Sequence, residues 1–487
     1  MKKLKKKFKI YDPKIKEECA VFGISNSNDA STLTALGLHA LQHRGQEGAG
    51  IVTFDGNGFH GVRRTGLVGD NFNKPEIIDR LKGRNAIGHV RYSTTGDSIS
   101  RNIQPLYADL SSGGFACAHN GNLTNASILR ESLVNQGAIF QSTSDTETIL
   151  QLVAKSTRDR MVDKIIDALF QIQGAYSLVI LTNKKLIGVR DPFGIRPLVL
   201  GDLNGAPVLA SETCALDIIG AKYVRDVENG EIIIISEDGL ESIKPFPKVL
   251  ERPCIFERIY FSRPDSIIGG KTVYSYRKKL GEQLAKENTI DVDVVIPVPD
   301  SGVPAALGYS QKSKIPFELG IIRNHYVGRT FIEPAQNIRQ FGVKLKHNAN
   351  LSYIEGKRVV LIDDSIVRGT TAKKIVKMMY DAGAKEVHIG IACPPITNPD
   401  FYGIDTPDYN ELISSKHSIE EVNSIVGSKS LFYLSLDGTY KAMGYEKRDN
   451  NNPQFTDHCF TGDYPTSLLD RDEGNTAKQY SLLSEKN

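Results

Sequence analysis

A clear pattern of apolar and polar residues lies in the second half of the chain. Four consecutive apolar residues, Val359–Ile362, predict a short strand buried on both of its faces. A loop of acids, hydroxyls and Gly369 follows, and the next apolar residues share one helical face. That face consists of Ala372, Ile375, Val376 and Met379, and Gly383 can end the helix. The polar loop therefore lies between the carboxyl end of a strand and the amino end of a helix, where free N–H groups favour an anion.

The segment after residue 256 alternates helix-like and strand-like runs, which predicts a parallel α/β domain. Within it, Asp293–Gly302 has the pattern of a second buried strand that runs into a turn. Parallel strands end at the same edge of a sheet, and ligands bind there in open α/β sheets. We therefore expect this turn and the polar loop to lie close together. Pro245–Arg252 has the composition of a linker that precedes the domain.

The first half of the chain is richer in strand-like runs and in short polar segments. Cys19 opens a run, Ala20–Ile24, that predicts a buried strand. Later runs are interrupted by Leu41–Gly50 and by Gly88–Gly96, which places Arg91 within a short strand that runs into a turn. His119–Asn122 is a predicted turn, and Ser144–Glu147 is the predicted start of a capped helix. After Tyr176 the pattern predicts alternating strands with little helix.

Composition sets limits on the assignment. A chain of 487 residues is long enough for two or three domains, and 40% hydrophobic and 24% charged residues are ordinary for a globular protein. The net charge of +3 neither favours nor excludes a nucleic acid partner, and no apolar run approaches the roughly 20 residues of a membrane span. Six scattered cysteines without CxxC spacing indicate neither a disulfide framework nor a zinc ribbon, so we expect a cytoplasmic protein.

Two adjacent acids and several hydroxyls define the chemistry of the polar loop. Asp363 and Asp364 only accept hydrogen bonds when ionised, so they suit a ribose diol or a hydrated Mg²⁺ rather than a phosphate. The backbone N–H groups at the helix start suit the phosphate. A ligand with a 5-phosphate, a ribose diol and a metal ion would use the whole stretch, whereas a generic polar turn would need none of it. The stretch has no Gly-x-x-x-x-Gly-Lys pattern, which disfavours a Walker-type nucleotide site.

Val359–Thr371 resembles the phosphoribosyl pyrophosphate (PRPP) loop of type I phosphoribosyltransferases. Asp300–Gly302 match the pyrophosphate loop of that family, and Arg323–Pro334 resembles its flexible loop, although an exposed hairpin would have the same composition. The resemblance implies that the domain binds PRPP with one Mg²⁺ per subunit. The implied PRPP-binding residues are Asp300, Ser301, Gly302, Tyr326, Arg329, Asp363, Asp364, Ser365, Arg368, Gly369, Thr370 and Thr371, and the implied metal-associated residues are Ser301, Asp363 and Asp364.

The ordered polar segments of the first half, from Cys19 to about Ile235, resemble the glutaminase domain of the N-terminal-nucleophile amidotransferases. The resemblance implies an αββα sandwich. Two further segments, Val189–Pro197 and Ala210–Thr213, also match that domain, and we interpret both as architectural.

The same resemblance implies roles for five residues around a glutamine substrate. Arg91 would clamp the glutamine carboxylate, and Asp145 would accept from its ammonium. The Asn120 side chain and the Gly121 N–H would form the oxyanion hole, and Arg44 would order the site. A surface ion pair is the plainer alternative for Arg91 or Asp145 taken alone.

Cys19 is the implied nucleophile, and its chemistry requires a free amino terminus. A thiol with a pKa of about 8.5 needs a base, and an α-amine with a pKa of about 7.7–8.0 can accept its proton. Cys19 has such an amine only if residues 1–18 are removed as a propeptide, and Glu17 and Glu18 fit the acidic residues that precede the cleavage point in some family members. The lysine-rich run Lys2–Lys9 lacks the apolar core of a secretion signal. A buried structural thiol is the alternative for Cys19 alone.

The two halves together resemble the glutamine phosphoribosylpyrophosphate amidotransferase family, from Cys19 to about Asp463. The implied reaction converts glutamine, PRPP and water to 5-phosphoribosylamine, glutamate and pyrophosphate, with internal transfer of ammonia, as the first committed step of purine synthesis. We expect a removed propeptide at 1–18, a glutamine amidotransferase domain at 19–250, a phosphoribosyltransferase domain at 251–465 and a disordered tail at 466–487.

Two alternative functions can be compared with this assignment. Other amidotransferases, such as glucosamine-phosphate synthase or asparagine synthetase, share the first half, but Val359–Thr371 excludes their second halves. A non-catalytic PRPP-sensing regulator would keep the second half, but it would not need the intact residues Cys19, Arg91 and Asp145.

Some members of the family bind a [4Fe–4S] cluster through four cysteines. Here Cys254 matches one ligand, Asp400 stands at a second position, and Pro453 and Thr456 lie where a C-terminal cysteine pair would be. One cysteine cannot hold such a cluster, so we predict no iron–sulfur centre. The family also suggests a homotetramer and inhibition by purine mononucleotides, and we expect no nucleic acid or membrane partner.

Overall fold

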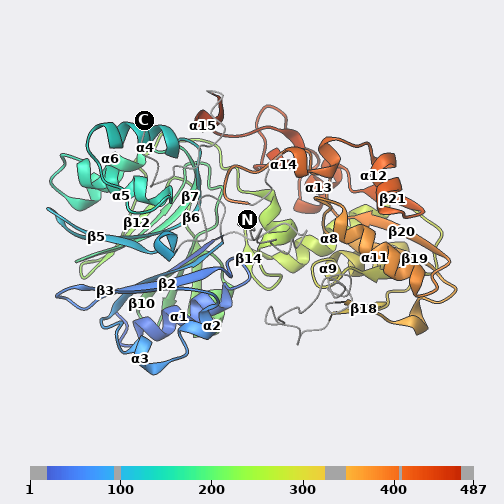
Figure 1. Ribbon diagram of the computed structural model, residues 1–487, viewed down its shortest axis with the longest axis horizontal. Coiled ribbons are helices and arrows are strands. Elements are labelled where there is room, and N and C mark those ends of the chain that lie inside the picture. The colour runs from blue at the N-terminus through green and yellow to red at the C-terminus, as the bar shows by residue number, and fades with distance from the viewer. Residues whose placement is uncertain (1–18, 93–99, 324–346, 405–408, 473–487) are drawn as a thin grey trace, which may run out of the picture. The chain divides into compact units, whose positions relative to one another are not determined.

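The computed structural model describes residues 19–92, 100–323, 347–404 and 409–472 (Figure 1). These residues form two compact units. The first contains residues 19–276, 400–404 and 448–472, and the second contains residues 277–323, 347–399 and 409–447. The domain boundary expected near residue 250 stays a prediction, and residues 251–276 pack with the first unit.

Two antiparallel sheets form the centre of the first unit. One sheet has seven strands in the order β11-β9-β10-β1-β4-β2-β3, and the other has six in the order β13-β12-β8-β7-β6-β5. The strands are β1 Ala20–Ile24, β2 Gly48–Phe54, β3 Phe59–Thr65, β4 Asn85–Arg91, β5 Leu106–Leu110, β6 Gly113–Leu123, β7 Gly174–Thr182, β8 Leu186–Arg190, β9 Val199–Leu203, β10 Ala206–Ala210, β11 Lys222–Asp226, β12 Ile232–Ser236 and β13 Gly239–Ile243.

Helices cover the outer face of each sheet, as Figure 1 shows. The helices on the seven-stranded sheet are α1 Ala30–Ala40, α2 Val68–Asn71, α3 Pro75–Ile78 and α7 Cys214–Ile219, and those on the six-stranded sheet are α4 Ala126–Asn135, α5 Thr146–Lys155 and α6 Met161–Leu169. Three hydrophobic cores separate the four layers, one under each set of helices and one between the sheets. The predicted αββα sandwich is therefore confirmed.

Several short elements complete the first unit. They are η1 Ser100–Asn102, the π-helical turn η2 Glu257–Phe261, the two-stranded ribbon β14 Ile267–Ile268 and β15 Lys271–Thr272, α14 His458–Thr461 and α15 Leu469–Asp472. Helix α8, Val273–Glu287, continues the chain from the first unit into the second.

The segment His119–Asn122 does not form the predicted turn. It continues β6, and its four residues pair with Ala175–Leu178 of β7. Gly121 has a φ of +140°, and a Cβ at this position would lie 2.0 Å from the carbonyl oxygen of Ala175. The prediction was wrong because pairing with a buried neighbouring strand outweighs the local turn preference of Asn and Gly.

The C-terminal tail, which we expected to be disordered from residue 466, is ordered at its start. Both carboxylate oxygens of Asp470 accept hydrogen bonds from first-turn N–H groups of α4, from Ser127 at 3.0 Å and from Ile128 at 3.2 Å. Asn125 precedes α4 but makes no capping bond with its side chain. Asp470 therefore supplies the cap from a distant part of the sequence. Residues 473–487 lie outside the described residues.

The second unit contains a parallel sheet with the order β16-β19-β20-β21. Its elements are β16 Val294–Pro297, α9 Val303–Ser313, β17 Ile321–Arg323, β18 His347–Ala349, η4 Leu351–Tyr353, β19 Arg358–Asp363, α11 Thr370–Asp381, β20 Glu386–Ile391, η5 Tyr409–Glu411, η6 Ile413–Ser415, α12 Ile419–Val426, β21 Ser430–Tyr433 and α13 Leu436–Met443. The predicted parallel α/β domain is confirmed. Among the helices within the described ranges, none is both long and apolar enough to cross a membrane.

Candidate active site

Cys19 lies immediately before the central strand β1 and is 9% exposed. Its thiol lies within hydrogen-bond distance of the Tyr92 carbonyl oxygen, with 3.5 Å between Sγ and that oxygen. Its own carbonyl oxygen accepts from Arg44 Nε at 3.3 Å. Strand β1 is buried along its whole length between β10 and β4. The main chain that carries the predicted nucleophile is therefore held on both sides.

Arg44 connects Cys19 to two buried acids. Its guanidinium donates to Glu212 Oε1 at 2.7 Å and to both carboxylate oxygens of Glu257 at 2.7 and 2.9 Å. The three side chains are at most 3% exposed. Such a fork of donors matches carboxylates better than a point charge does. This position fits the expectation that Arg44 orders the site, and that role stays a prediction.

Glu212 remains a carboxylate inside the protein. Its burial alone would raise the pKa, but His43 and Arg44 outweigh that effect and hold the pKa of Glu212 well below its usual range. The Ser266 hydroxyl also donates to it, with 2.7 Å between the oxygens. Neither Glu212 nor Glu257 was predicted as a site residue. The only signal in the sequence was the segment Ala210–Thr213, which we interpreted as architectural.

The proposed oxyanion residues, Asn120 and Gly121, lie on β6. Asn120 is fully buried, and its Oδ1 has no hydrogen-bond partner among the described residues. Its Nδ2 lies 3.5 Å from Ser211 Oγ. Gly121 cannot be replaced without a clash, as its contact with Ala175 shows. An amide that is buried but incompletely bonded has hydrogen-bonding capacity left for a ligand.

Asp145 lies beside this strand, at the start of α5. Its carboxylate accepts from Thr146 N at 2.8 Å and from Leu123 N at 3.0 Å, and it lies 3.6 Å from His119 Nδ1. Burial raises the pKa of Asp145, but His119 and the two N–H groups outweigh it and lower the pKa. Asp145 is therefore negatively charged at neutral pH, as an acceptor for an ammonium requires.

Arg91 ends β4 and is 5% exposed. Its Nη1 donates to the Asn102 carbonyl oxygen at 2.8 Å. Burial and the nearby Arg91 charge lower the pKa of His89 to about 3, so this histidine is neutral. A surface ion pair does not describe Arg91, because the residue is buried.

The predicted PRPP and pyrophosphate loops lie side by side in the second unit. Strands β16 and β19 are parallel neighbours, and Val298 N donates to the Ile362 carbonyl oxygen at 2.9 Å. A Cβ on Gly302 would lie 2.3 Å from that oxygen, so glycine permits the close approach. The sequence therefore predicted correctly that the two loops meet at one edge of the sheet.

Acids and hydroxyls gather at this edge. Asp364 is 5% exposed and accepts from the Ser365 hydroxyl, with 2.5 Å between the oxygens, while Asp363 Oδ1 accepts from Asp364 N at 2.9 Å. The buried Ser301 hydroxyl has no hydrogen-bond partner in the described parts of the chain. Asp300 forms an exposed ion pair with Arg323.

The start of α11 has the geometry of an anion site. Gly369 has a φ of +72° and precedes the first helical residue, Thr370, and no side chain caps the helix. The side chain of Arg368 is paired with Glu411, with 2.7 Å between Nε and Oε2. Thr371 follows in the first turn. The N–H groups of a first helical turn can donate hydrogen bonds to a phosphate.

Residues 409–417 contact the predicted PRPP loop, and the sequence did not predict this contact. Ile413 N donates to the Val367 carbonyl oxygen at 2.9 Å, and a Cβ on Gly369 would meet the Ile413 side chain at 2.7 Å. Glu411 comes from the same segment. The predicted residues Tyr326 and Arg329, and the predicted propeptide 1–18, lie outside the described residues.

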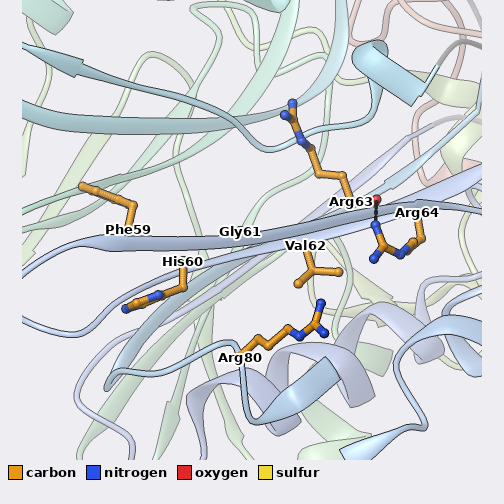
Figure 2. Close-up of a pocket in the computed structure, with 7 residues that line it drawn as sticks. All are labelled: Phe59, His60, Gly61, Val62, Arg63, Arg64 and Arg80. Carbon is orange, nitrogen blue, oxygen red and sulfur yellow. Dashed lines mark hydrogen bonds between the residues drawn. The ribbon is translucent and has the colours of Figure 1, made fainter. Parts of the chain in front are cut away.

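Figure 2 shows a hollow on the first unit that is separate from these residues. It is lined by Phe59, His60, Gly61, Val62, Arg63, Arg64 and Arg80. Six of the seven belong to the edge strand β3, and Arg63 and Arg64 point to opposite sides of it. The hollow contains no predicted site residue, and its lining has neither a carboxylate nor a thiol. We assign it no role in the chemistry.

Comparison with known proteins finds a match for each half of the chain. Sequence profiles for a glutamine amidotransferase domain and a phosphoribosyl transferase domain match residues 89–217 and 276–409. Amidophosphoribosyltransferase of Rhizobium etli is 59% identical over 474 residues, 96% of each chain, and that of Bacillus subtilis is 48% identical over 455 residues, 93% of this chain and 95% of that protein. The solved structure of B. subtilis glutamine PRPP amidotransferase, complexed with ADP and GMP, has a TM-score of 0.87 and 47% identity, covering 92% of this chain and 98% of that one. This chain belongs to the amidophosphoribosyltransferase family.

Proposed function

We propose that the two units divide the reaction of an amidophosphoribosyltransferase between them. The first unit hydrolyses glutamine at Cys19, and the second uses the ammonia to displace pyrophosphate from PRPP, giving 5-phosphoribosylamine for purine synthesis. The observation that carries this proposal is that each unit has a candidate site with a buried polar atom that lacks a hydrogen-bond partner among the described residues. Asn120 Oδ1 in the first unit and Ser301 Oγ in the second are buried polar atoms without partners among the described residues.

In the first unit, Arg91 binds the α-carboxylate of the glutamine and Asp145 binds its α-ammonium. A buried guanidinium binds a carboxylate through two parallel hydrogen bonds, and a charged buried carboxylate binds an ammonium. These contacts fix the substrate amide next to the thiol, which converts the reaction into an intramolecular attack. These contacts select a free α-amino acid, because an analogue that lacks either charge leaves Arg91 or Asp145 without its substrate partner.

Cys19 attacks the glutamine amide carbon after its thiol proton passes to its own α-amine. The α-amine exists only when residues 1–18 have been removed, so the mature chain begins at Cys19. The carbonyl oxygen becomes an oxyanion that Asn120 and the Gly121 N–H stabilise. Ammonia then leaves, and water hydrolyses the thioester to glutamate, which regenerates the thiol.

In the second unit, the first turn of α11 binds the 5-phosphate, and Asp363 and Asp364 accept hydrogen bonds from the ribose diol. Ammonia attacks C1 of the ribose as the bond to pyrophosphate breaks. The carboxylates and the free Ser301 hydroxyl are hard oxygen donors, so they fit one Mg²⁺ that also contacts the substrate. When bound, Mg²⁺ neutralises charge on the leaving pyrophosphate. Among the described residues no cluster of three or more His, Cys, Asp or Glu side chains could hold a metal alone.

The residues at the family's iron–sulfur position do not fit a cluster. Asp400 lies 2.8 Å from His458 Nε2 and 3.8 Å from Arg196 Nη2, and the Thr456 hydroxyl donates to the Arg252 carbonyl oxygen. Thr456 is the bridge partner of Cys254, so Asp400 and Thr456 offer a carboxylate and a hydroxyl where a cluster would need thiolates. We therefore propose that the protein is active without iron, which measurement of iron and sulfide in the purified enzyme tests.

Regulation and assembly are also proposals. The B. subtilis relative was solved with ADP and GMP, and we propose that purine mononucleotides inhibit this chain as well. The homotetramer and the cytoplasmic location stay predictions, and analytical ultracentrifugation tests the first of them. The alternative of a non-catalytic PRPP sensor is not favoured, because the relatives with high identity are named as enzymes.

The decisive experiment measures glutamate and pyrophosphate release from glutamine with and without PRPP and Mg²⁺, on protein whose amino terminus is known from its intact mass. We expect PRPP to stimulate glutamate formation strongly, with pyrophosphate released in equal amount. Glutamate formation that ignores PRPP would refute the role of the second unit. Absence of both products on a chain that begins at Cys19 would refute the whole assignment, whereas full activity of a chain that retains Met1 would refute the propeptide.

A further inference from the structure

Ser211 lies at the end of β10, where it contacts both the nucleophile strand and the proposed oxyanion residue. It is fully buried. Its Oγ accepts the Val21 N–H at 2.9 Å, and its own N–H donates to the Val21 carbonyl oxygen at 3.0 Å. Val21 is the second residue after Cys19. The same Oγ lies 3.5 Å from the side-chain amide of Asn120. One hydroxyl therefore joins the two parts of the candidate glutaminase site.

The hydrogen bonds around Ser211 are unequal. The contact with Val21 is short, whereas the contact between Asn120 Nδ2 and the hydroxyl is at the limit of a hydrogen bond. The other end of the same amide, Asn120 Oδ1, is buried without a partner in the described chain. A buried polar atom of this kind is unfavourable unless a ligand or a rearrangement satisfies it.

The chemistry of the hydroxyl offers that rearrangement. A serine hydroxyl has two acceptor positions and one proton to donate. Ser211 uses one acceptor position on Val21, so its proton is available for Asn120. A half-turn of the Asn120 amide about its last bond exchanges the NH₂ group and the oxygen. The hydroxyl then donates to Oδ1, and the NH₂ group takes the position that now holds the unpartnered oxygen.

This orientation matters because the two ends of an amide have opposite effects on an anion. An oxyanion is stabilised by N–H donors and is repelled by a carbonyl oxygen. The orientation with the NH₂ group facing the substrate needs a neighbour that donates to Oδ1. Ser177, the partner of Asn120 across the β6–β7 ladder, does not do this, because its hydroxyl donates to the Arg196 carbonyl oxygen at 3.2 Å.

We propose that Ser211 is a positioning residue that fixes the orientation of the Asn120 amide, so that its NH₂ group faces the carbonyl under attack at Cys19. The inference rests on the proposed function, in which Asn120 contributes to the oxyanion hole. A purely architectural serine would explain the two bonds to Val21, but it would not explain the contact with Asn120.

The test compares Ser211→Ala with Ser177→Ala, which removes another fully buried serine hydroxyl from the same unit. Asn120→Ala and the double variant complete the cycle. For each, kcat and KM for glutamine hydrolysis are measured at saturating PRPP, together with the rate at which iodoacetamide alkylates Cys19. Phosphoribosylamine formation from ammonium salts reports the second unit alone.

We expect Ser211→Ala to lower kcat about 10-fold. Loss of a whole oxyanion donor costs roughly 100- to 1,000-fold, which is more. Its KM and its alkylation rate should stay within about threefold of wild type, and Ser177→Ala should keep kcat within about twofold. In the Asn120→Ala background, adding Ser211→Ala should lower kcat by less than about threefold, because the amide that Ser211 orients is absent. Ser211→Thr, which keeps the hydroxyl, should restore kcat.

Three results overturn the inference alone, and a fourth also overturns the oxyanion assignment. The first is a Ser211→Ala kcat within twofold of wild type while Asn120→Ala is slow, which leaves the proposed function intact. The second is a full additional loss in the double variant. The third is a fall in alkylation rate parallel to kcat, which indicates an architectural role. A normal kcat for Asn120→Ala refutes the oxyanion assignment and this inference together. If Ser211→Ala fails to fold, kcat is compared between Ser211→Cys and Ser211→Thr. Only Thr keeps a strong hydrogen-bond donor, so equal kcat values for the two variants would refute the inference.

Discussion

Arg44 is the residue whose loss the structure predicts to be most damaging to the first unit. Its side chain donates hydrogen bonds at 2.7 Å to Glu212, at 2.7 and 2.9 Å to Glu257 and at 3.3 Å to the Cys19 carbonyl oxygen. Arg44→Met keeps the length of the side chain but removes the charge. Two carboxylates, each at most 3% exposed, then lose a counter-charge.

The size of the effect follows from what remains around the acids. Breaking a buried ion pair costs about 3–5 kcal/mol. Glu212 keeps His43 at 2.8 Å, and Glu257 keeps Arg196 at 3.4 Å and the Ser262 hydroxyl at 2.6 Å. The cost therefore stays within that range although two acids are affected. At about 2–4 °C per kcal/mol, the midpoint of thermal unfolding should fall on the order of 10 °C. Arg44→Lys keeps the charge without the fork and should lose about half as much.

Scanning calorimetry of the purified variants measures this shift, and Arg160→Met is the matched control. Arg160 pairs with Asp163 in the same unit, but its side chain is 80% exposed. Water screens such a pair, so its removal should leave the midpoint unchanged. The reasoning fails if Arg44→Met melts within about 2 °C of wild type, or if Arg160→Met shifts the midpoint as much.

The other predictions concern the two sites and their stability. Cys19→Ala should abolish glutamine-dependent product formation and preserve the ammonia-dependent reaction, and loss of both would contradict the division between units. Asp364→Asn should lower PRPP-dependent turnover on the order of 100-fold without changing Cys19 alkylation. Glu411→Gln should free Arg368 and raise KM for PRPP about 5- to 10-fold while KM for glutamine stays constant, which steady-state kinetics measures. The folded-state pKa of Glu212 is lowered, so its charge stabilises the fold above an unfolded pKa of about 4.3, and this stabilisation is lost as the pH falls. Glu212→Gln should therefore have a lower unfolding midpoint than wild type at pH 7. Its midpoint should fall less than that of wild type between pH 5 and pH 3, which scanning calorimetry measures.

Local patterns in the sequence predicted those parts of the fold whose residues are neighbours along the chain. The strand Val359–Ile362 and the buried helical residues Ile375, Val376 and Met379 occur as predicted. The turn predicted for His119–Asn122 was wrong, because its partner strand begins about 50 residues later and pairing with that strand decides the conformation. The order at Asp470 was missed for a similar reason, since the helix that it caps lies 343 residues away.

The sequence by itself determined the chemistry of the two reactions. Its motifs predicted Cys19 as the nucleophile and Asp363–Thr371 as part of a PRPP loop. The predicted loop consists of consecutive residues, which one strand, turn and helix place together. Only the tertiary structure decided what supports this chemistry. Glu212 and Glu257 reach Arg44 from 168 and 213 residues away, and Ser211 reaches Val21 across 190 residues. A buried charge or amide is stable only with partners, and the fold, not the neighbouring sequence, supplies them.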